Sequence, residues 1–269
     1  LTVADKLGLA LAMVPAWGYY INDNPVLTTA NAAVYGKWLG KRYKNRKNLI
    51  WMNGGDRIPT GFEDVYRALA AGIRAGGARQ LMTYHPCGWR SSSQFFHHET
   101  WLDFNMIETW TEWTKVHHAV TSDLAKSPPK PVVLGEGAYE DGPEYPQGPI
   151  TALVARKQAW WSYLAGGFHT YGQNDQWRMG KGWRKNVNAP GSNHMKVISQ
   201  VLEKGPWWTL VQDQGIFVTG PGSGTQINAA ARSADGSWIV IYLAGKGSVS
   251  LHLDHLTASA SCRATWINP

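Results

Sequence analysis

The sequence has no uninterrupted run of about 18 apolar residues, which excludes a conventional transmembrane helix. It has only two cysteines, Cys87 and Cys262, which lie far apart without the spacing of a metal site or a disulfide framework. Phenylalanine is scarce at 6 residues, whereas tryptophan reaches 15 and tyrosine 11. Because tryptophan combines a flat apolar face with an N–H donor, this excess fits either a Trp-rich core or surfaces on which sugar rings stack.

Acidic side chains are outnumbered, with 19 Asp and Glu against 26 Lys and Arg and a net charge of +7. Such a balance permits nucleic acid, an anionic polysaccharide or another acidic surface as a partner. The basic residues are mostly dispersed, and their one cluster, 37–47, is interleaved with Trp38, Leu39 and Tyr43 in a helix-like segment. We interpret this cluster as a solvated helix face, and we predict no nucleic-acid partner.

A glycine fingerprint for dinucleotides is also absent after the early apolar runs. The chain instead alternates short apolar runs with helix-like stretches. The runs are Leu9–Pro15, Leu49–Asp56, Gln80–Pro86, Trp101–Trp110, Pro131–Glu140 and Gly166–Asp175. The stretches between them include Asn31–Tyr43, Phe62–Ala75, Thr111–Ala125 and Ala152–Leu164. Apolar runs without polar alternation are typical of strands buried on both faces, and repeated strand–helix units predict a parallel sheet covered by helices.

Each apolar run ends in polar or glycine-rich residues, and function at the carboxyl ends of parallel strands is typical of a (β/α)8 barrel. A closed barrel has eight strands, whereas the chain shows six runs. We therefore predict an α/β fold of the (β/α)8 TIM-barrel type that lacks its first two strand–helix units. The strands at Leu9–Pro15 and Gly166–Asp175 then have open edges, which a missing N-terminal piece or a second copy in a homo-oligomer is expected to cover.

The C-terminal part of the chain differs, because apolar and polar residues alternate there between glycine-rich turns. This pattern predicts a small antiparallel, sandwich-like β domain over residues 205–269, after a partial barrel over residues 1–204. Asp235-Gly236 is a strong hairpin signal between two of its strands, and Thr219–Thr225 is expected to form another hairpin loop.

Two carboxylates stand at the ends of predicted strands, Asp56 in the second run and Glu136 in the fifth. Paired acids across a barrel mouth suit glycoside hydrolysis, in which one protonates the leaving oxygen and the other attacks carbon or activates water. A structural role is the alternative, with Asp56 capping a helix or pairing with Arg57 and Glu136 pairing with a nearby Arg or His. The Trp, His and Asn residues at neighbouring strand ends favour catalysis.

The geometry of these two carboxyl groups decides the mechanism. Double displacement places them about 5–5.5 Å apart, and inversion places them about 6.5–9.5 Å apart. We expect Asp56 to be the more desolvated, because a general acid must hold its proton near neutral pH. We expect Glu136 to stay ionised by accepting hydrogen bonds, with Tyr84, His85 or Asn105 as donors.

Further polar and aromatic side chains near the strand ends can hold sugar hydroxyls or stack on sugar rings. The predicted substrate-binding set is Trp17, Arg57, Tyr84, His85, Asn105, His169, Tyr171, Asn174 and Trp177. We predict no metal and no cofactor, because the histidine pairs His97-His98 and His117-His118 are adjacent in sequence and point in different directions on a helix.

Several segments resemble the apiosidase-like glycoside hydrolases of family 140. They are VPAWG (Val14–Gly18), YGKWLGKRYKNRKNLIWMNGGDR (Tyr35–Arg57), TYHPCGWRSSSQFFHHETWLDFNMI (Thr83–Ile107), PVVLGEGAYE (Pro131–Glu140) and GGFHTYGQNDQW (Gly166–Trp177). The resemblance covers roughly the first two hundred residues. The chain departs from the family after Ile107, where Glu108-Thr109-Trp110 stand in place of Gln-Ser-Gly-His.

The resemblance implies a (β/α)8 glycosidase in which the Asp of the GGD motif is the acid/base and the Glu of the GE motif is the nucleophile. These residues are Asp56 and Glu136, which would end barrel strands four and seven. The resemblance also implies retention of configuration, and a secreted or periplasmic bacterial protein.

The leading hypothesis is a glycosidase that acts on a plant cell-wall polysaccharide, as on a pectic side chain. An endo-β-glucanase of the cellulase type on the same scaffold is one alternative, and a non-catalytic carbohydrate-binding barrel is another. In each case the expected partner is a polysaccharide or oligosaccharide, with no membrane contact.

Overall fold

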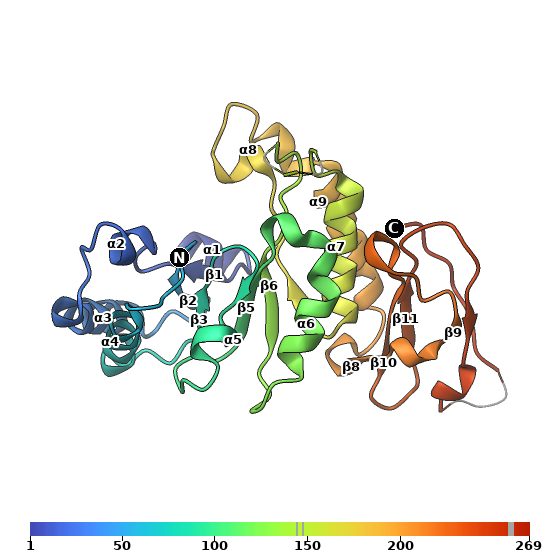
Figure 1. Ribbon diagram of the computed structural model, residues 1–269, viewed down its shortest axis with the longest axis horizontal. Coiled ribbons are helices and arrows are strands. Elements are labelled where there is room, and N and C mark those ends of the chain that lie inside the picture. Colours follow the sequence, from blue (N-terminus) through green and yellow to red (C-terminus); the bar gives the residue numbers. More distant parts are fainter. Residues whose placement is uncertain (144, 147, 258–260) are drawn as a thin grey trace. The chain divides into compact units, whose positions relative to one another are not determined.

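The computed structural model describes residues 1–143, 145–146, 148–257 and 261–269 (Figure 1). The chain divides into two compact units, and each combines two stretches of sequence. The first unit comprises Leu1–Glu108 with Lys126–Val132, and the second comprises Thr109–Ala125 with Val133–Pro269.

The first unit contains most of the predicted strand–helix repeats. Its helices are α1 (Thr2–Lys6), α2 (Tyr19–Asn22), α3 (Thr29–Tyr43), α4 (Glu63–Ala75) and α5 (Ser93–Phe96). Its strands are β1 (Leu11–Met13), β2 (Leu49–Gly54), β3 (Met82–His85), β4 (Arg90–Ser91) and β5 (Asn105–Glu108). Strands β1, β2 and β3 form a parallel sheet in that order, and β4 pairs antiparallel with β5. The parallel pairing predicted for the first three strands is confirmed, whereas β5 pairs antiparallel with the short β4, which the sequence did not predict.

The core of the first unit is rich in aromatic side chains. Helix α4 buries Tyr66, Leu69 and Ile73, and every residue of β3 is buried. The ring of Tyr84 in β3 meets the rings of Tyr66 and Phe96 edge-on, at centroid distances of 5.1 and 4.9 Å. Edge-to-face contacts of this kind add to the free energy gained by burial. Part of the aromatic excess therefore lies in the core.

Helices α3 and α4 pack backbone to backbone (Figure 1). A Cβ atom on Gly36 would lie 2.4 Å from the Leu69 carbonyl oxygen, and one on Gly40 would lie 2.1 Å from the Ile73 carbonyl oxygen. Gly72 in α4 approaches Ala33 in the same way, at 2.3 Å. The glycines in α3 therefore set the distance between the two helices, despite the low helix propensity of glycine.

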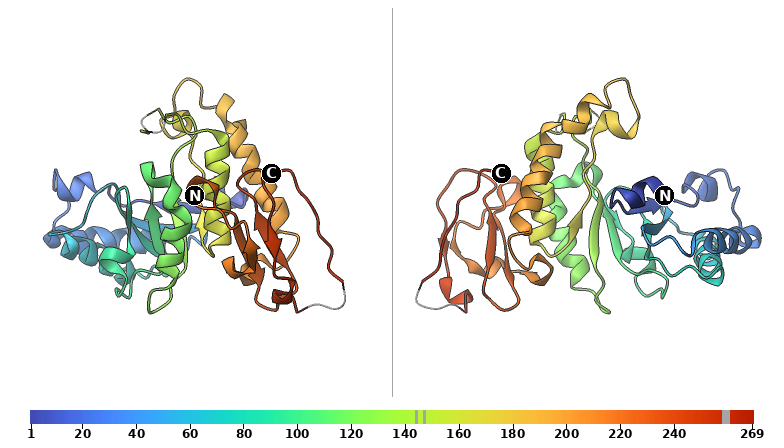
Figure 2. Two further views of the ribbon diagram at one scale, coloured as in Figure 1. Left: turned by 45° about the vertical axis from the view of Figure 1, so that its right-hand side comes forward. Right: turned by 180° about the vertical axis from the view of Figure 1, so that it is seen from behind.

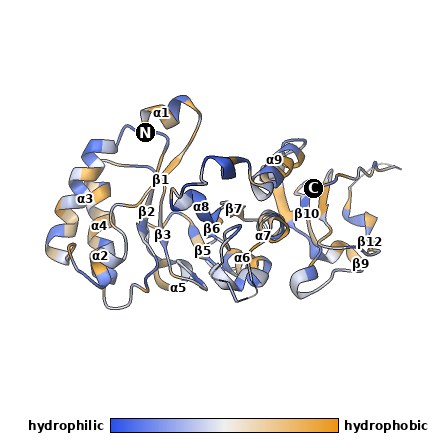
Figure 3. Cartoon of the chain, turned by 90° about the horizontal axis from the view of Figure 1, so that it is seen from above, coloured by the Kyte–Doolittle hydropathy of each residue, from blue (hydrophilic) through white to orange (hydrophobic). Residues whose placement is uncertain are grey.

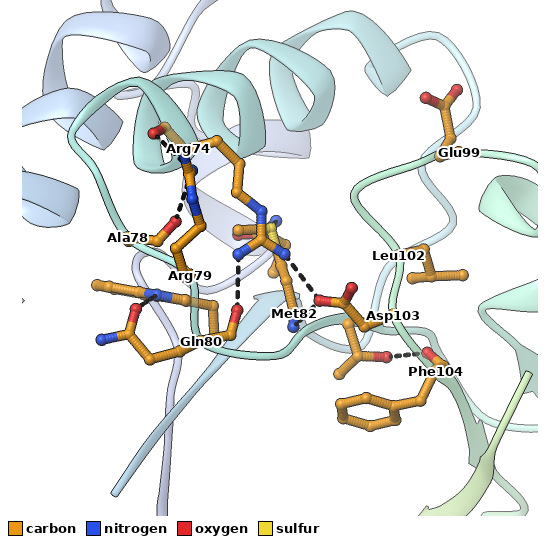
Figure 4. Close-up of polar contacts among 12 residues, drawn as sticks. Arg74, Ala78, Arg79, Gln80, Met82, Glu99, Leu102, Asp103 and Phe104 are labelled. Carbon is orange, nitrogen blue, oxygen red and sulfur yellow. Dashed lines mark hydrogen bonds and ion pairs between the residues drawn. The ribbon is translucent and has the colours of Figure 1, made fainter. Parts of the chain in front are cut away.

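A polar network ties α4 to the starts of β3 and β5 (Figure 4). The Arg74 guanidinium donates to the Gln80 carbonyl and to the Asp103 carboxylate, both at 2.7 Å. The same carboxylate accepts the Met82 N–H at 2.7 Å, and the Asp103 N–H donates to the Met82 carbonyl at 2.8 Å. These charge-assisted bonds fix the amino ends of two strands whose carboxyl ends carry candidate site residues.

The second unit begins with the 3-10 helix η1 (Trp110–Lys115) and α6 (Val116–Leu124), which together replace the single predicted helix over Thr111–Ala125. Strand β6 (Val132–Glu136), which belongs to this unit from Val133 onward, pairs in parallel with β7 (Phe168–His169), as predicted. Helices α7 (Ala152–Leu164), α8 (Asn174–Trp177) and α9 (Pro190–Leu202) follow, with η2 (Lys185–Asn188) between the last two. Helices α7 and α9 lie side by side (Figure 2).

The C-terminal part of the second unit is antiparallel, as predicted. One sheet has the order β11 (Ile239–Tyr242), β10 (Ala229–Ser233) and β8 (Leu210–Gln212), and the other pairs β12 (Ser250–Leu251) with β9 (Phe217–Thr219). Short 3-10 helices accompany them: η3 (Trp207–Thr209), η4 (Gln214–Ile216), η5 (Gly224–Gln226) and η6 (Leu253–His255). The predicted boundary between residues 204 and 205 stays a prediction.

The two hairpin signals have different outcomes. Asp235-Gly236 connects the paired strands β10 and β11, with Gly236 at a φ of 71°, so this prediction is confirmed. The prediction for Thr219–Thr225 is wrong, because the strands that flank it, β9 and β10, belong to different sheets. Among the described residues, no helix is both long and apolar enough to cross a membrane.

We expect the substitution Gly40→Ala to lower the free energy of unfolding by about 2 kcal/mol, although alanine favours the helix, because the new methyl group overpacks a rigid backbone contact. Urea denaturation followed by circular dichroism measures the change. The control is Val34→Ala on the exposed side of the same helix, which should change the free energy by less than about 0.5 kcal/mol. An unchanged stability of Gly40→Ala would contradict the glycine contact.

Candidate active site

Asp56 stands on a turn that only glycine can build. Gly54, Gly55 and Asp56 all have positive φ angles, of 88°, 126° and 50°. A Cβ atom on Gly54 would lie 2.6 Å from the His85 carbonyl oxygen, and one on Gly55 would lie 2.4 Å from the ring of Trp17. The chain therefore turns sharply at the end of β2, and Asp56 is exposed. The expectation that Asp56 is the more desolvated of the two acids is wrong, since Glu136 is half-buried.

The turn is held by the end of the neighbouring strand. The Gly55 N–H donates to the His85 carbonyl at 2.9 Å, and the Asp56 N–H donates to the Pro86 carbonyl at 3.1 Å. These bonds continue the β2–β3 pairing beyond the strands themselves. Asp56 and His85 are thus placed next to each other by the backbone.

Three titratable side chains converge at this place in the first unit. One oxygen of Asp56, one imidazole nitrogen of His85 and one oxygen of Glu108 lie within 4.8 Å of one another. His85 and Glu108 are buried, with 3.6 Å between His85 Nδ1 and Glu108 Oε2. His85 Nδ1 also lies 2.8 Å from the Pro86 carbonyl oxygen, which can only accept, so Nδ1 carries a proton.

Glu108 is a site residue that the sequence reasoning missed. It is the last residue of β5, whereas Asn105, which we predicted to bind substrate at the end of this run, is the first. Asn105 is fully buried and lies 3.3 Å from His97 Nδ1. Because His97 Nε2 faces the Pro128 carbonyl at 3.0 Å, Nε2 donates and Nδ1 accepts from the Asn105 amide. This structural pair places Asn105 away from the carboxyl end of the strand, which corrects its predicted position.

Tyr84 and Arg57 support the turn. The fully buried Tyr84 hydroxyl donates to the Arg57 carbonyl at 2.8 Å, and burial raises the pKa of this phenol far above its usual range. The Arg57 guanidinium donates to the Asp56 carbonyl at 2.8 Å and to Asp23 at 2.5 Å. The Arg57 side chain therefore binds the Asp56 carbonyl and the Asp23 carboxylate instead of the Asp56 carboxylate. Arg57 and Tyr84 together hold the backbone around Asp56.

One exposed tryptophan contacts the cluster in the first unit, and another exposed tryptophan follows β3 in the sequence. Trp17 is 37% exposed and its ring meets the His85 imidazole edge-on at 5.3 Å. Trp89 is 50% exposed, in a left-handed conformation with a φ of 64°. The first is a predicted substrate-binding residue, and the second is an addition from the structure. Exposed indole faces beside a carboxylate are suited to sugar rings.

The charges around the cluster shift the pKa of the neighbouring Cys87 thiol. Burial raises the pKa of its thiol, the negative charge of Glu108 raises it further, and the positive charge of Arg90 opposes both. Arg90 is exposed and its backbone pairs with that of Glu108 across β4 and β5. One cation thus stands at the edge of a group with two carboxylates.

In the second unit, Glu136 ends β6 and is oriented by a tyrosine. The Tyr139 hydroxyl donates to Glu136 Oε1 at 2.7 Å. The Tyr84 hydroxyl cannot supply the bond predicted for Glu136, because its single proton goes to Arg57. Asn105 pairs with His97 instead. A hydrogen bond from Tyr139 favours the ionised form of the carboxylate, as a nucleophile requires.

The segment after Glu136 is held by a buried amide. Gln158 in α7 accepts the Ala138 N–H at 2.7 Å and donates to the Ala138 carbonyl at 3.1 Å. A Cβ atom on Gly137 would lie 2.5 Å from the Gln158 oxygen. A side chain at position 137 would therefore collide with Gln158, which explains why residue 137 is glycine. The two bonds from Gln158 fix the backbone between Glu136 and Tyr139.

The other predicted residues of the second unit separate into two groups. Trp177 is 58% exposed and lies near Tyr139, with 6.4 Å between ring centroids. The Tyr171 hydroxyl donates to the buried Glu140, so its proton serves an internal bond. Asn174 opens α8 with its N–H bound to the Glu140 carbonyl at 2.9 Å. Of these three residues only Trp177 is largely exposed, and it lies beside Tyr139, which binds Glu136.

His169 ends β7 and faces a cleft of about 390 Å³ within the second unit. The cleft is lined mainly by apolar residues of β7 and α9, among them Phe168, Met195 and Leu202. Burial lowers the pKa of His169 to about 4, so its imidazole is neutral at neutral pH and can exchange hydrogen bonds but not form an ion pair.

The predicted catalytic and substrate-binding residues fall into one group in each compact unit. Trp17, Asp56, Arg57 and His85 gather at the carboxyl ends of β2 and β3, and Glu136 with Trp177 gathers around Tyr139. In the first unit Asp56, His85 and Glu108 form a converging set of histidine and carboxylate groups that offers ligand atoms to a cation, which the histidine pairs in the sequence did not predict. The distance between Asp56 and Glu136 stays a prediction.

Comparisons with known proteins agree with the resemblance seen in the sequence. No curated protein matches the chain. Among solved structures, a glycoside hydrolase family 5 protein from Bacteroides vulgatus ATCC 8482 has a TM-score of 0.87 and 28% identity, over 95% of this chain and 62% of that one. A structure described as a glycoside hydrolase has a TM-score of 0.82 and 30% identity, over 90% of this chain and 61% of that one.

The chain therefore spans less than two thirds of the length of these two relatives. Its mixed α/β fold matches barrel-type glycoside hydrolases closely. Residues 1–209 match the family described as "Apiosidase-like, catalytic domain". The chain belongs to this family of apiosidase-like catalytic domains, as the resemblance in its sequence predicted.

Proposed function

We propose that the chain hydrolyses glycosidic bonds in a plant cell-wall polysaccharide, on a pectic side chain, by double displacement. The observation that carries the proposal is Asp56, which the glycine turn lifts out of β2 beside His85 and Glu108 in a chain of this family. Glu136, at the end of a second parallel strand and bound by Tyr139, supplies the other carboxylate.

The two carboxylates divide the reaction between them. Glu136 attacks the anomeric carbon while Asp56 protonates the glycosidic oxygen, so the bond to the leaving group breaks as the covalent glycosyl-enzyme forms. Asp56 then removes a proton from water, which releases the sugar and restores Glu136.

Exposed tryptophans support carbohydrate as the ligand class. Trp17 in the first unit is exposed and contacts His85, and Trp177 in the second is exposed and contacts Tyr139. An indole face stacks on the C–H face of a sugar and excludes water from it. Export from a bacterial cell and action on an extracellular polymer belong to this proposal as well.

The first test compares Asp56→Asn and Glu136→Gln with the parent on pectic side-chain oligosaccharides and on aryl glycosides. We expect each variant to lose about a thousandfold in kcat/KM on the oligosaccharides. Asp56→Asn should regain turnover on aryl glycosides with good leaving groups when azide is added, because azide needs no base and such groups need no acid. Trp177→Ala should raise KM more than it lowers kcat, because Trp177 is proposed to bind the sugar and not to take part in bond cleavage.

The product of azide rescue distinguishes the two roles. A glycosyl azide of retained configuration from Asp56→Asn supports double displacement with Asp56 as acid/base. Binding without any hydrolysis by the parent would instead favour the non-catalytic carbohydrate-binding alternative. Cleavage inside β-glucan chains with inert pectic substrates would favour the endo-β-glucanase.

The second test concerns Glu108 as a positioning residue. Its negative charge lies near Asp56 and opposes loss of the Asp56 proton, so Glu108→Gln should move the alkaline limb of the kcat/KM profile to lower pH. We expect kcat to fall about tenfold with little change in KM. The surface variant Asp64→Asn in the same unit should leave the profile unchanged. A uniform loss at every pH would mean that Glu108 acts only on folding.

The third test removes metal ions. Double displacement needs only the two carboxylates, so dialysis against a chelator should leave kcat/KM unchanged. Loss of activity that a single divalent cation restores would assign Asp56, His85 and Glu108 to a metal site and contradict the acid/base role of Asp56.

A further inference from the structure

The solvent face of α3 carries positive charge that nothing in the described chain neutralises. Residues 24–55 contain six Lys and Arg and no Asp or Glu. All six are exposed: Lys37, Lys41, Arg42, Lys44, Arg46 and Lys47. Within the described ranges, none of them forms an ion pair with a carboxylate. Figure 3 shows hydrophilic and hydrophobic residues interspersed along this helix.

An aromatic strip runs through these charges. Tyr35, Trp38 and Arg42 are three and four residues apart, so they follow one side of the helix. The Tyr35 and Trp38 rings are nearly parallel, at 13° and 6.3 Å between centroids, and the Arg42 guanidinium lies 5.5 Å from the Trp38 ring centre. Tyr35 is anchored by its hydroxyl, which donates to the Pro15 carbonyl at 3.0 Å. Trp38 nevertheless stays 54% exposed.

Helix stability accounts for only part of this pattern. Lys41 and Arg42 lie in the last turn, where cations favour the helix dipole. The glycine contacts with α4 occupy the opposite side of the helix. Neither effect explains a large indole that stays 54% exposed among the charges, because tryptophan has a lower helix propensity than alanine.

We propose that the α3 basic face, which consists of Tyr35, Trp38, Lys41 and Arg42, binds a polysaccharide of uronic acid residues. A sugar ring would contact the exposed part of the Trp38 indole, whose ring also packs against Tyr35 and Arg42. Lys41 and Arg42 would pair with the carboxylates of neighbouring sugars. Duplex nucleic acid fits less well, since its bases stack on one another and offer Trp38 no ring. The face is separate from Asp56, His85 and Glu108, so it holds the polymer rather than cleaving it.

The test measures binding of the whole chain to sodium polygalacturonate by affinity electrophoresis and calorimetry at low and high salt. The variant carries Trp38→Ala, Lys41→Gln and Arg42→Gln. The matched control carries Trp208→Ala, Lys204→Gln and Lys246→Gln, which removes one exposed indole and two exposed cations from the second unit. We expect the α3 variant to raise Kd about tenfold and to flatten its salt dependence, with the control unchanged.

Two further ligands complete the design. Fully methyl-esterified polygalacturonate keeps the sugar rings but lacks the charge, and it should bind the parent at least about tenfold more weakly. Equal binding of the ester, or equal Kd values for the two triple variants, would overturn the proposal. So would single- or double-stranded DNA that binds this face more tightly than polygalacturonate. Because the readout is binding, failure of the proposed hydrolysis leaves this test intact, and unchanged turnover of an aryl glycoside by the α3 variant separates the two.

Discussion

The backbone pairing of β2 with β3, continued past both strands, is the constraint on which the candidate site depends. Two N–H groups of the turn, from Gly55 and Asp56, donate to carbonyls at the end of β3. A residue held in a left-handed conformation is strained unless its surroundings fix it. Here the bonds, the Trp17 ring over Gly55 and the Tyr84 hydroxyl beneath the turn fix it together. The backbone of Asp56 is therefore preorganised by the sheet.

Much of the fold was predictable because apolar runs record burial directly. The six predicted strands appear as β1, β2, β3, β5, β6 and β7. Asp56 and Glu136 were found because each directly follows such a run. Glu108 was not found. The buried Trp101 and Leu102 lie in the loop before β5 but extend the apolar run towards the N-terminus, so the run placed Asn105 near the strand end although it is the first residue of β5.

Strand parity explains another part of what the sequence did not reveal. Successive residues of a strand point to opposite faces, so Tyr84 and His85 cannot both face the same site. The structure turns His85 to the carboxylates and Tyr84 to the aromatic core. The same rule separates Asn105 from Glu108 on β5. Which face is which depends on helices elsewhere in the chain, and no local pattern records it.

Each compact unit is discontinuous in sequence, since the backbone passes from one unit to the other after Glu108, Ala125 and Val132. The returning stretch supplies the Pro128 and Pro131 carbonyls that accept from His97 and the Asn105 backbone in the first unit. A chain ended at Glu108 would leave those two buried donors unsatisfied. A chimaera with a relative therefore cannot exchange one unit through a single junction. Residues 109–125 must be exchanged together with residues 133–269.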